Sequence, residues 1–347
     1  MKRTIPILAL LCALIFSCKD EPIRNGGQTV YVTGHELNAN GISIRGGYWK
    51  NGTQVVLSTK GLYSPSIFLS GQDVYVSGKE ISATGNFSLK YWKNNKPKSL
   101  TDGTNDVDGG YIFVKGNDVY VAATEFNGAA YVAKVWKNGI PTSLTDGLNT
   151  TIVKGVFVSG SDVYVVGHEQ MTTNFVAKYW KNGQEVTLAD DNTYSFAMDL
   201  KVVGNDVYVT GYQNIENKLV AVYWKNGVRT ILSNADVSFA NSIFVSNRGV
   251  YVCGVEITAQ GVFATYWENG NPVHLTDGQG DASATSICLV GSDIYVAGFD
   301  GVDPNHIAKF WKNNSAFNLT DGSTNAFAFG IAVKSSREED KEKSEKD

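Results

Sequence analysis

The sequence of 347 residues carries little charge: Asp, Glu, Lys and Arg together make up 18%, and the formal net charge is −4. It therefore lacks the basic footprint that binding to nucleic-acid phosphates requires, and we expect no nucleic-acid partner. The apolar run at residues 4–16 is too short to cross a bilayer as a helix.

The signatures of common catalytic and metal sites are also missing. The four histidines are scattered, and no His/Cys pair has the spacing of zinc ligands. Residues 101–109 are rich in Asp but lack the ligand spacing and the closing Glu of an EF-hand loop. No Gly-rich phosphate loop or nucleophile elbow occurs. We therefore expect no metal, no cofactor and no catalytic residue of these kinds.

The sequence is rich in glycine and in residues that favour β-strands. It contains 36 Gly, 17 Tyr and 16 Phe, and 43% of its residues are hydrophobic. Because glycine supplies turns and aromatic residues favour strands, the composition indicates an all-β protein with a large core.

A repeat of about 44 residues organises the chain. Tryptophan occurs once in each copy: Trp49, Trp92, Trp136, Trp180, Trp224, Trp267 and Trp311. The central Tyr of a Val-Tyr-Val-like strand follows the same period: Tyr31, Tyr75, Tyr120, Tyr164, Tyr208, Tyr251 and Tyr295. Two markers in register predict seven structural repeats.

Each copy is expected to form four strands. In residues 154–190, strands A (155–158), B (163–167), C (175–180) and D (185–188) are separated by polar turns. Strands C and D are joined by Lys-Asn-Gly, and Asn-Gly is a strong hairpin signal because both residues accept positive φ. Four-stranded units of this length are typical of propeller blades.

The two ends of the repeat array predict how the ring closes. Residues 29–34 form a strand B with no strand A before it, whereas residues 329–333 form a strand A with no strand B after it. Pairing the two would remove the exposed edges. The sequence thus predicts an all-β, seven-bladed β-propeller over residues 28–334, with four antiparallel strands per blade. The C-terminal inner strand, from residues 327–334, completes the N-terminal blade.

The repeat resembles a family of bacterial extracellular repeats. The pattern Ala-x-Tyr-Trp-Lys-Asn-Gly, followed by Leu-Thr-Asp-Gly, is similar to HAF-type repeats and is clearest at residues 177–183 and 221–227. The aromatic residue usual just after Ala in that family is absent here. The resemblance implies a secreted propeller without implying an activity. The signatures of WD40, kelch and sialidase propellers are absent.

The N-terminus resembles the signal of a bacterial lipoprotein. A basic start at residues 1–3 and the apolar run lead to residues 15–18, Ile-Phe-Ser-Cys, which are similar to a lipobox. The resemblance implies removal of residues 1–17 and lipidation of Cys18, for example with palmitate, which would anchor the protein to a membrane. An ordinary secretory signal in which Cys18 is incidental is the alternative.

The flanking polar segments complete the predicted organisation. Residues 19–21, Lys-Asp-Glu, resemble the export signal of surface lipoproteins in the Bacteroidota, which implies a surface-exposed outer-membrane protein with a tether at residues 18–27. A plain solvated tether is the alternative. Residues 335–347 are almost wholly charged and are predicted to be disordered. We expect a monomer.

Two other features are interpreted as packing. A Trp in the middle of strand C is expected to pack between adjacent blades, with stacking on a sugar as the alternative. Cys253 and Cys288 lie in apolar strands of different repeats, which favours buried free thiols over a disulfide.

One repeated position is acidic. Five residues after each strand-B Tyr, at the expected start of the B–C loop, lie Glu36, Glu80, Glu125, Glu169, Gln213, Glu256 and Asp300. We call these residues the acidic ring. It could capture a cation or an amine. A residue that recurs in nearly every blade fits a structural role better, and we expect it to accept backbone N–H groups of the neighbouring loop.

A specific site should instead break the repeat. Strand A is expected to line the central channel, and two adjacent positions on it differ from blade to blade; a third, Lys201, replaces a Phe present in four blades. The candidate ligand-binding residues near the axis are Lys154, Asp199, Lys201, Tyr111 and Met198. Sequence drift, or a local Asp–Lys pair, is the alternative.

Three functions remain open. The favoured one is a non-enzymatic binding module on the bacterial envelope, with a protein or glycan partner at the loop face or channel mouth. The second is a glycan hydrolase or lyase using acidic residues at the channel mouth, which would need an isolated acid pair outside the repeat. The third is a purely structural surface lipoprotein.

Overall fold

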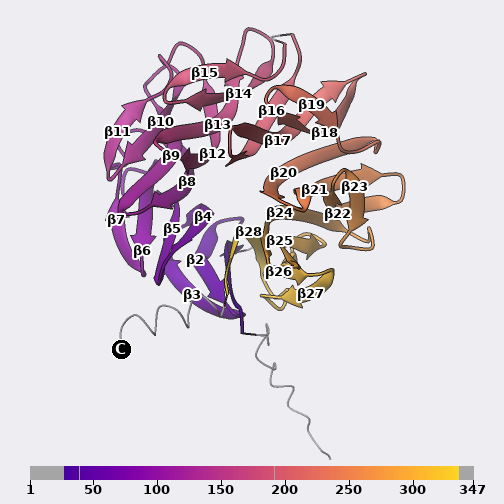
Figure 1. The fold of residues 1–347 in the computed structure, drawn as a ribbon. Helices are drawn as coiled ribbons and strands as arrows, with labels where there is room; N and C mark the ends of the chain where they lie inside the picture. The colour runs from indigo at the N-terminus through magenta and orange to yellow at the C-terminus, as the bar shows by residue number, and fades with distance from the viewer. Residues whose placement is uncertain (1–26, 39, 191, 336–347) are drawn as a thin grey trace, which may run out of the picture.

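The computed structural model describes residues 27–38, 40–190 and 192–335. Over these residues its 28 strands form seven four-stranded antiparallel sheets, arranged as the blades of a propeller (Figure 1). The predicted all-β, seven-bladed architecture is therefore confirmed. No helix among the described residues is long and apolar enough to cross a membrane. The predicted signal, Cys18 and the charged tail beyond residue 335 lie outside the described residues.

Each blade has the strand order A, B, C, D from the axis outward. The A strands of blades 1 to 7 are β28 (Asn325–Lys334), β4 (Leu62–Ser70), β8 (Val107–Lys115), β12 (Thr151–Ser159), β16 (Ser195–Val203), β20 (Val237–Ser246) and β24 (Asp281–Val290). The B strands are β1 (Thr29–Leu37), β5 (Asp73–Ile81), β9 (Asp118–Phe126), β13 (Asp162–Gln170), β17 (Asp206–Ile215), β21 (Gly249–Thr258) and β25 (Asp293–Gly301).

The outer half of each blade is shorter. The C strands are β2 (Ser43–Lys50), β6 (Phe87–Lys93), β10 (Tyr131–Lys137), β14 (Phe175–Lys181), β18 (Lys218–Lys225), β22 (Gly261–Glu268) and β26 (Ile307–Lys312). The D strands are β3 (Thr53–Ser58), β7 (Lys96–Ser99), β11 (Ile140–Ser143), β15 (Gln184–Thr187), β19 (Val228–Ile231), β23 (Asn271–His274) and β27 (Ser315–Asn318).

Strand A is longer than the sequence predicts. In blade 4 the apolar pattern placed it at residues 155–158, whereas β12 begins at Thr151. Lys154 interrupts the pairing with β13, because Val153 lies opposite Gly167 while Gly155 lies opposite Val166. A β-bulge of this kind adds one residue to one strand and breaks the two-residue period, which hid the first half of the strand.

The Lys-Asn-Gly turns between strands C and D have the expected geometry. Asn182 and Gly183 have φ angles of 51° and 81°, as a type I′ turn requires. Oδ1 of Asn182 accepts a hydrogen bond from the backbone N–H of Val163 (2.9 Å), and its Nδ2 donates to Asp162 (2.8 Å). Nζ of Lys181 pairs with the same carboxylate at 2.8 Å. These contacts tie the C–D turn to the A–B turn, although such half-exposed ion pairs contribute little stability individually.

The strand-C tryptophans fill the interfaces between blades, as predicted. Trp224 of blade 5 packs in one cluster with Tyr164, Ala177 and Leu188 of blade 4. All seven tryptophans are at most 3% exposed. Their faces are therefore covered by the neighbouring blade and are not free to stack on a sugar.

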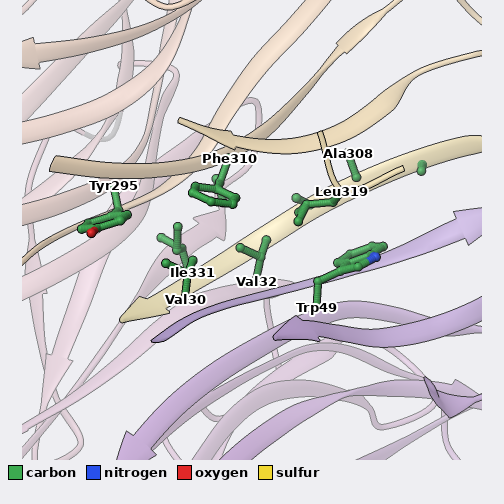
Figure 2. Close-up of a cluster of buried hydrophobic side chains, with 11 residues drawn as sticks. Val30, Val32, Trp49, Tyr295, Ala308, Phe310, Leu319 and Ile331 are labelled. Atoms are coloured by element: carbon green, nitrogen blue, oxygen red, sulfur yellow. The ribbon is translucent and has the colours of Figure 1, made fainter. Parts of the chain in front are cut away.

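The ring closes as the sequence predicts. In blade 1, β28 pairs with β1 in an antiparallel ladder that sets Val30 opposite Val333 and Val32 opposite Ile331. Figure 2 shows that Val30, Val32 and Ile331 pack together with Trp49 against a second group from blade 7. That group consists of Tyr295, Ala308, Phe310 and Leu319. The last strand thus completes the first blade and joins it to the seventh.

Candidate functional site

A channel of about 810 Å³ lies at the centre of the ring. Strand A of every blade contributes to its lining, as the sequence predicts for the innermost strand. The volume is within the range of small-molecule binding sites. All five candidate residues of the irregular group lie on this wall: Tyr111, Lys154, Met198, Asp199 and Lys201.

The irregular residues of strand A coincide with a bulge that recurs in every blade. The pairing register between strands A and B shifts once per blade, and the residues at the shift are Pro65, Gly110, Lys154, Met198, Asn241, Thr285 and Phe329. A bulged residue leaves the ladder and its side chain can be aimed elsewhere. All of these residues except Gly110 line the channel. Every blade except blade 3 therefore presents one variable side chain to the channel at the equivalent position of strand A.

Asp199, directly after the bulge in blade 5, is held by its neighbours. Its Oδ1 accepts a hydrogen bond from the backbone N–H of Leu200 (2.8 Å). Its Oδ2 accepts from Oγ of Ser242 (2.9 Å) and from the backbone N–H of Ile243 (3.0 Å) in blade 6. Lys201 Nζ lies 3.8 Å from Oδ1. Asp199 is thus a bridge between two blades and part of the local Asp–Lys pair that the sequence left open.

Unlike Asp199, Lys154 forms no hydrogen bond or ion pair with any described residue, although its charge acts on the Asp108 carboxylate. Tyr111, on the neighbouring blade 3, also lines the channel. Its hydroxyl forms no hydrogen bond with any described residue. Burial raises the pKa of Tyr111, so the hydroxyl keeps its proton. The charge of Lys154 acts against this rise in pKa, which indicates that the two side chains are close.

Aromatic rings cover one part of the wall. The ring centroids of Phe68 and Phe113 are 4.7 Å apart, and those of Phe113 and Phe157 are 4.9 Å apart. Lys201, at the equivalent position in blade 5, places Nζ 5.6 Å from the centroid of Phe157. The row of Phe rings on blades 2 to 4 is therefore followed on blade 5 by the ammonium group of Lys201.

The acidic ring does not lie where the sequence placed it. Its members are inside strand B rather than at the start of the B–C loop; Glu169, for example, belongs to β13 and is 7% exposed. Their partners are side chains rather than loop backbone groups. Most of these side chains belong to the same blade, but hydroxyls from the end of the preceding blade also donate, Ser58 to Glu80 and Ser233 to Glu256. Glu125 pairs with Lys134 and Glu169 with Lys178, each at 2.5 Å.

The pairing within the acidic ring follows the sequence of strand C. Glu80 pairs with Lys90, Asp300 with Lys309 (2.5 Å) and Glu36 with Arg45 (3.3 Å). In blade 6, where Thr265 replaces the lysine, His274 of strand D contacts Glu256 at 2.8 Å. In blade 5, where Val222 replaces it, the acid itself becomes Gln213, which accepts a hydrogen bond from Arg229 (2.9 Å). These internal pairs support the structural role, which stays a prediction.

Metal ligands, a second cavity and the two thiols also bear on function. Among the described residues, no group of three or more His, Cys, Asp or Glu could hold a metal ion. A second cavity of about 820 Å³ lies between blades 2 and 3, and is lined by Leu100, Thr101, Trp136 and the Glu80–Lys90 pair. Its central charged groups are already paired with each other. Cys253 and Cys288 are free thiols, as predicted.

Comparisons with known proteins define the fold and no more. No family model matches the chain, and no curated protein matches its sequence. The chain is similar to a puromycin-hydrolysing peptidase from Mycobacterium tuberculosis, with a TM-score of 0.54 and 12% identity over 87% of this chain and 52% of that one.

Two other solved structures are less similar. TolB from Acinetobacter baumannii gives a TM-score of 0.48 at 10% identity, over 71% of this chain and 62% of that one. A Trypanosoma rangeli sialidase gives 0.43 at 13% identity, over 90% and 58%. The chain thus spans about half of the peptidase and less than two thirds of the TolB and sialidase chains. At such low identity, these likenesses bear on the propeller fold alone.

Proposed function

We propose that this chain is a non-enzymatic binding module whose protein or glycan partner, or a smaller ligand, places a group in the central channel. Lys154 carries the proposal, because it is a cation on the wall of a concave site and forms no hydrogen bond or ion pair with any described residue. Buried structural lysines of this protein are paired: Lys178 contacts Glu169 at 2.5 Å and Glu185 at 2.7 Å. An unpaired charge in a partly apolar pocket is suited to a ligand of opposite charge.

The hydrolase or lyase alternative has less support. It needs two free carboxylates near one another. Asp199 is the one carboxylate on the channel wall among the described residues, and both its oxygens accept hydrogen bonds from the protein. The acidic ring is paired within the blades.

The binding proposal is tested with purified residues 19–347 on a glycan array and on panels of peptides and small acids. We expect binding without released product. Met198→Trp, which puts a larger side chain on the channel wall, should strongly weaken binding, whereas Lys98→Met on the exposed strand β7 should leave it unchanged. Release of product, or binding that Met198→Trp leaves unchanged in a folded variant, would contradict the proposal. A purely structural protein binds nothing on any panel.

We further propose that the module, with its HAF-like repeats, is anchored through Cys18 as an outer-membrane lipoprotein exposed on the cell surface. The support is the lipobox-like segment at residues 15–18 and the following Lys-Asp-Glu. Metabolic labelling with a palmitate analogue should label the wild-type protein and not Cys18→Ala, which should also leave the membrane fraction. An unlabelled wild-type protein in the soluble fraction would refute the anchor.

A further inference from the structure

Most polar side chains of the channel are committed to holding the ring together. Nδ2 of Asn241 donates to the carbonyl oxygen of Ala284 (2.9 Å), and Oγ1 of Thr285 donates to that of Ala328 (2.9 Å). Each bond joins one blade to the next, as the Ser242–Asp199 bond does. A neutral sugar needs several free donors and acceptors, because its hydroxyls lose water on binding. The channel offers few of them.

The charges on the channel wall do not cancel. Its charged residues are Lys154, Asp199 and Lys201, which leave one net positive charge. Lys201 lies beside Asp199. The charge of Lys154 acts on Asp108, but that carboxylate is already paired with Lys79 at 2.6 Å, so one positive charge stays in excess among these five residues. In a concave, partly apolar channel such a charge attracts an anion more strongly than a fully exposed lysine does, because the protein wall lowers the effective dielectric constant.

The polar residues of the wall are concentrated on blades 4 to 7, where they alternate with apolar residues such as Met198, Phe244 and Ile287, whereas blades 1 to 3 are almost wholly apolar. Asp199, Lys201, Asn241, Ser242, Thr285 and Ser286 come from blades 5 to 7, and Lys154 from blade 4. Blades 1 to 3 contribute Phe329, Pro65, Ile67, Phe68, Tyr111 and Phe113, with Ser66 as the polar exception. Blades 1 to 3 are therefore the more apolar side of the wall, and Lys154 of blade 4 and Tyr111 of blade 3 lie at one boundary of that side.

We infer that the channel binds a small amphiphilic carboxylate, with its anionic head on Lys154 and its apolar or aromatic body against blades 1 to 3. The Tyr111 hydroxyl donates a second hydrogen bond to the head group, and Phe68 and Phe113 contact the body. This inference rests on the proposed function and names the chemistry of its ligand.

The experiment uses purified residues 19–347 and four probes: 3-phenylpropionate, octanoate and the amide of each. Titration calorimetry should show binding of the carboxylates and much weaker binding of the amides. Lys154→Met should weaken carboxylate binding by about tenfold or more, since a charge-assisted hydrogen bond is lost. Lys98→Met is the matched control and should bind as the wild type does. Thermal melts establish that each variant is folded.

The outcomes separate this inference from the proposed function. If amides bind as well as acids and Lys154→Met has no effect, while Met198→Trp strongly weakens binding, the channel is a binding site but the inference is wrong. If carboxylates bind equally to the wild type, Lys154→Met and Met198→Trp, the site lies elsewhere and both proposals fail. Binding of none of the four probes overturns the inference, and the glycan and peptide panels then decide the proposed function.

Discussion

Among the described residues, three buried histidines have a ring nitrogen without a hydrogen-bond partner: His35, His168 and His306. His306 has a carboxylate, Asp281, at 3.4 Å, whereas in the described part of the chain His35 and His168 do not have one. His35 and His168 follow the strand-B Tyr by four residues in blades 1 and 4, and are 6% and 4% exposed. Nδ1 of each has no hydrogen-bond partner among the described residues. His35 lies among Tyr63, Phe327 and Phe329, with ring centroids 5.0 to 5.9 Å apart. Such surroundings disfavour the charged imidazolium.

These histidines predict a loss of stability in mild acid. Burial lowers the pKa of His35 to about 4 and that of His168 to about 3; for His168, Lys154 lowers it further while Ala197 and Asp108 oppose the shift. The unfolded chain takes up these protons near pH 6.5, before the folded protein does. Each histidine therefore costs up to about 1.4 kcal/mol of unfolding free energy per pH unit as pH falls from about 6.5 toward about 4.

Chemical denaturation of the wild type and of the double variant His35→Phe, His168→Phe tests this prediction. The variant should lose less stability than the wild type between about pH 7 and about pH 5, because it lacks both titrating groups. Lys98→Met, on the exposed strand β7, is the control and should keep the wild-type slope. Parallel loss of stability in the wild type and the double variant would show that the buried rings do not control it.

At the scale of single elements, the repeat made the blade readable from the sequence. Tryptophan, the strand-B Tyr and the Asn-Gly turn recur in copy after copy, so local ambiguity in one blade is resolved by the others. The same comparison picked out Lys154 and Met198 because they break the pattern. What it could not give is the bulge at both residues, since a register shift depends on the partner strand.

Contacts between blades could not be predicted from the sequence either. The partners that saturate Asp199 lie 43 and 44 residues away, in the next blade. The acidic ring was different, because its signal was present and was missed. The blades that lack the strand-C lysine, at Gly47, Val222 and Thr265, are those in which the acid or its partner also changes. Comparing the seven copies position by position would have revealed these pairs.

At the scale of the whole molecule, β28 is the element that makes the ring continuous. It forms the inner strand of blade 1, and Ile331 packs with Trp49 and Phe310 across the junction with blade 7. Deletion of residues 325–347 should therefore abolish cooperative unfolding, because it exposes the edge of β1 and opens this cluster. Thermal melts followed by tryptophan fluorescence check the prediction.

Deletion of residues 336–347 alone is the matched control for that experiment. It leaves β28 intact and should melt as the full chain does. If the longer deletion also melts at the same temperature with the same steepness, β28 is dispensable and the closure contributes nothing to stability.

The closure also determines when folding can be completed during synthesis. Because synthesis starts at the N-terminus, β1 is made long before β28. Blade 1 therefore lacks its inner strand while the other six blades are synthesised. Until then β1 keeps an unpaired edge that a foreign strand or a chaperone can occupy. A prematurely terminated product never covers that edge, and the cell can recognise it by this one exposed strand.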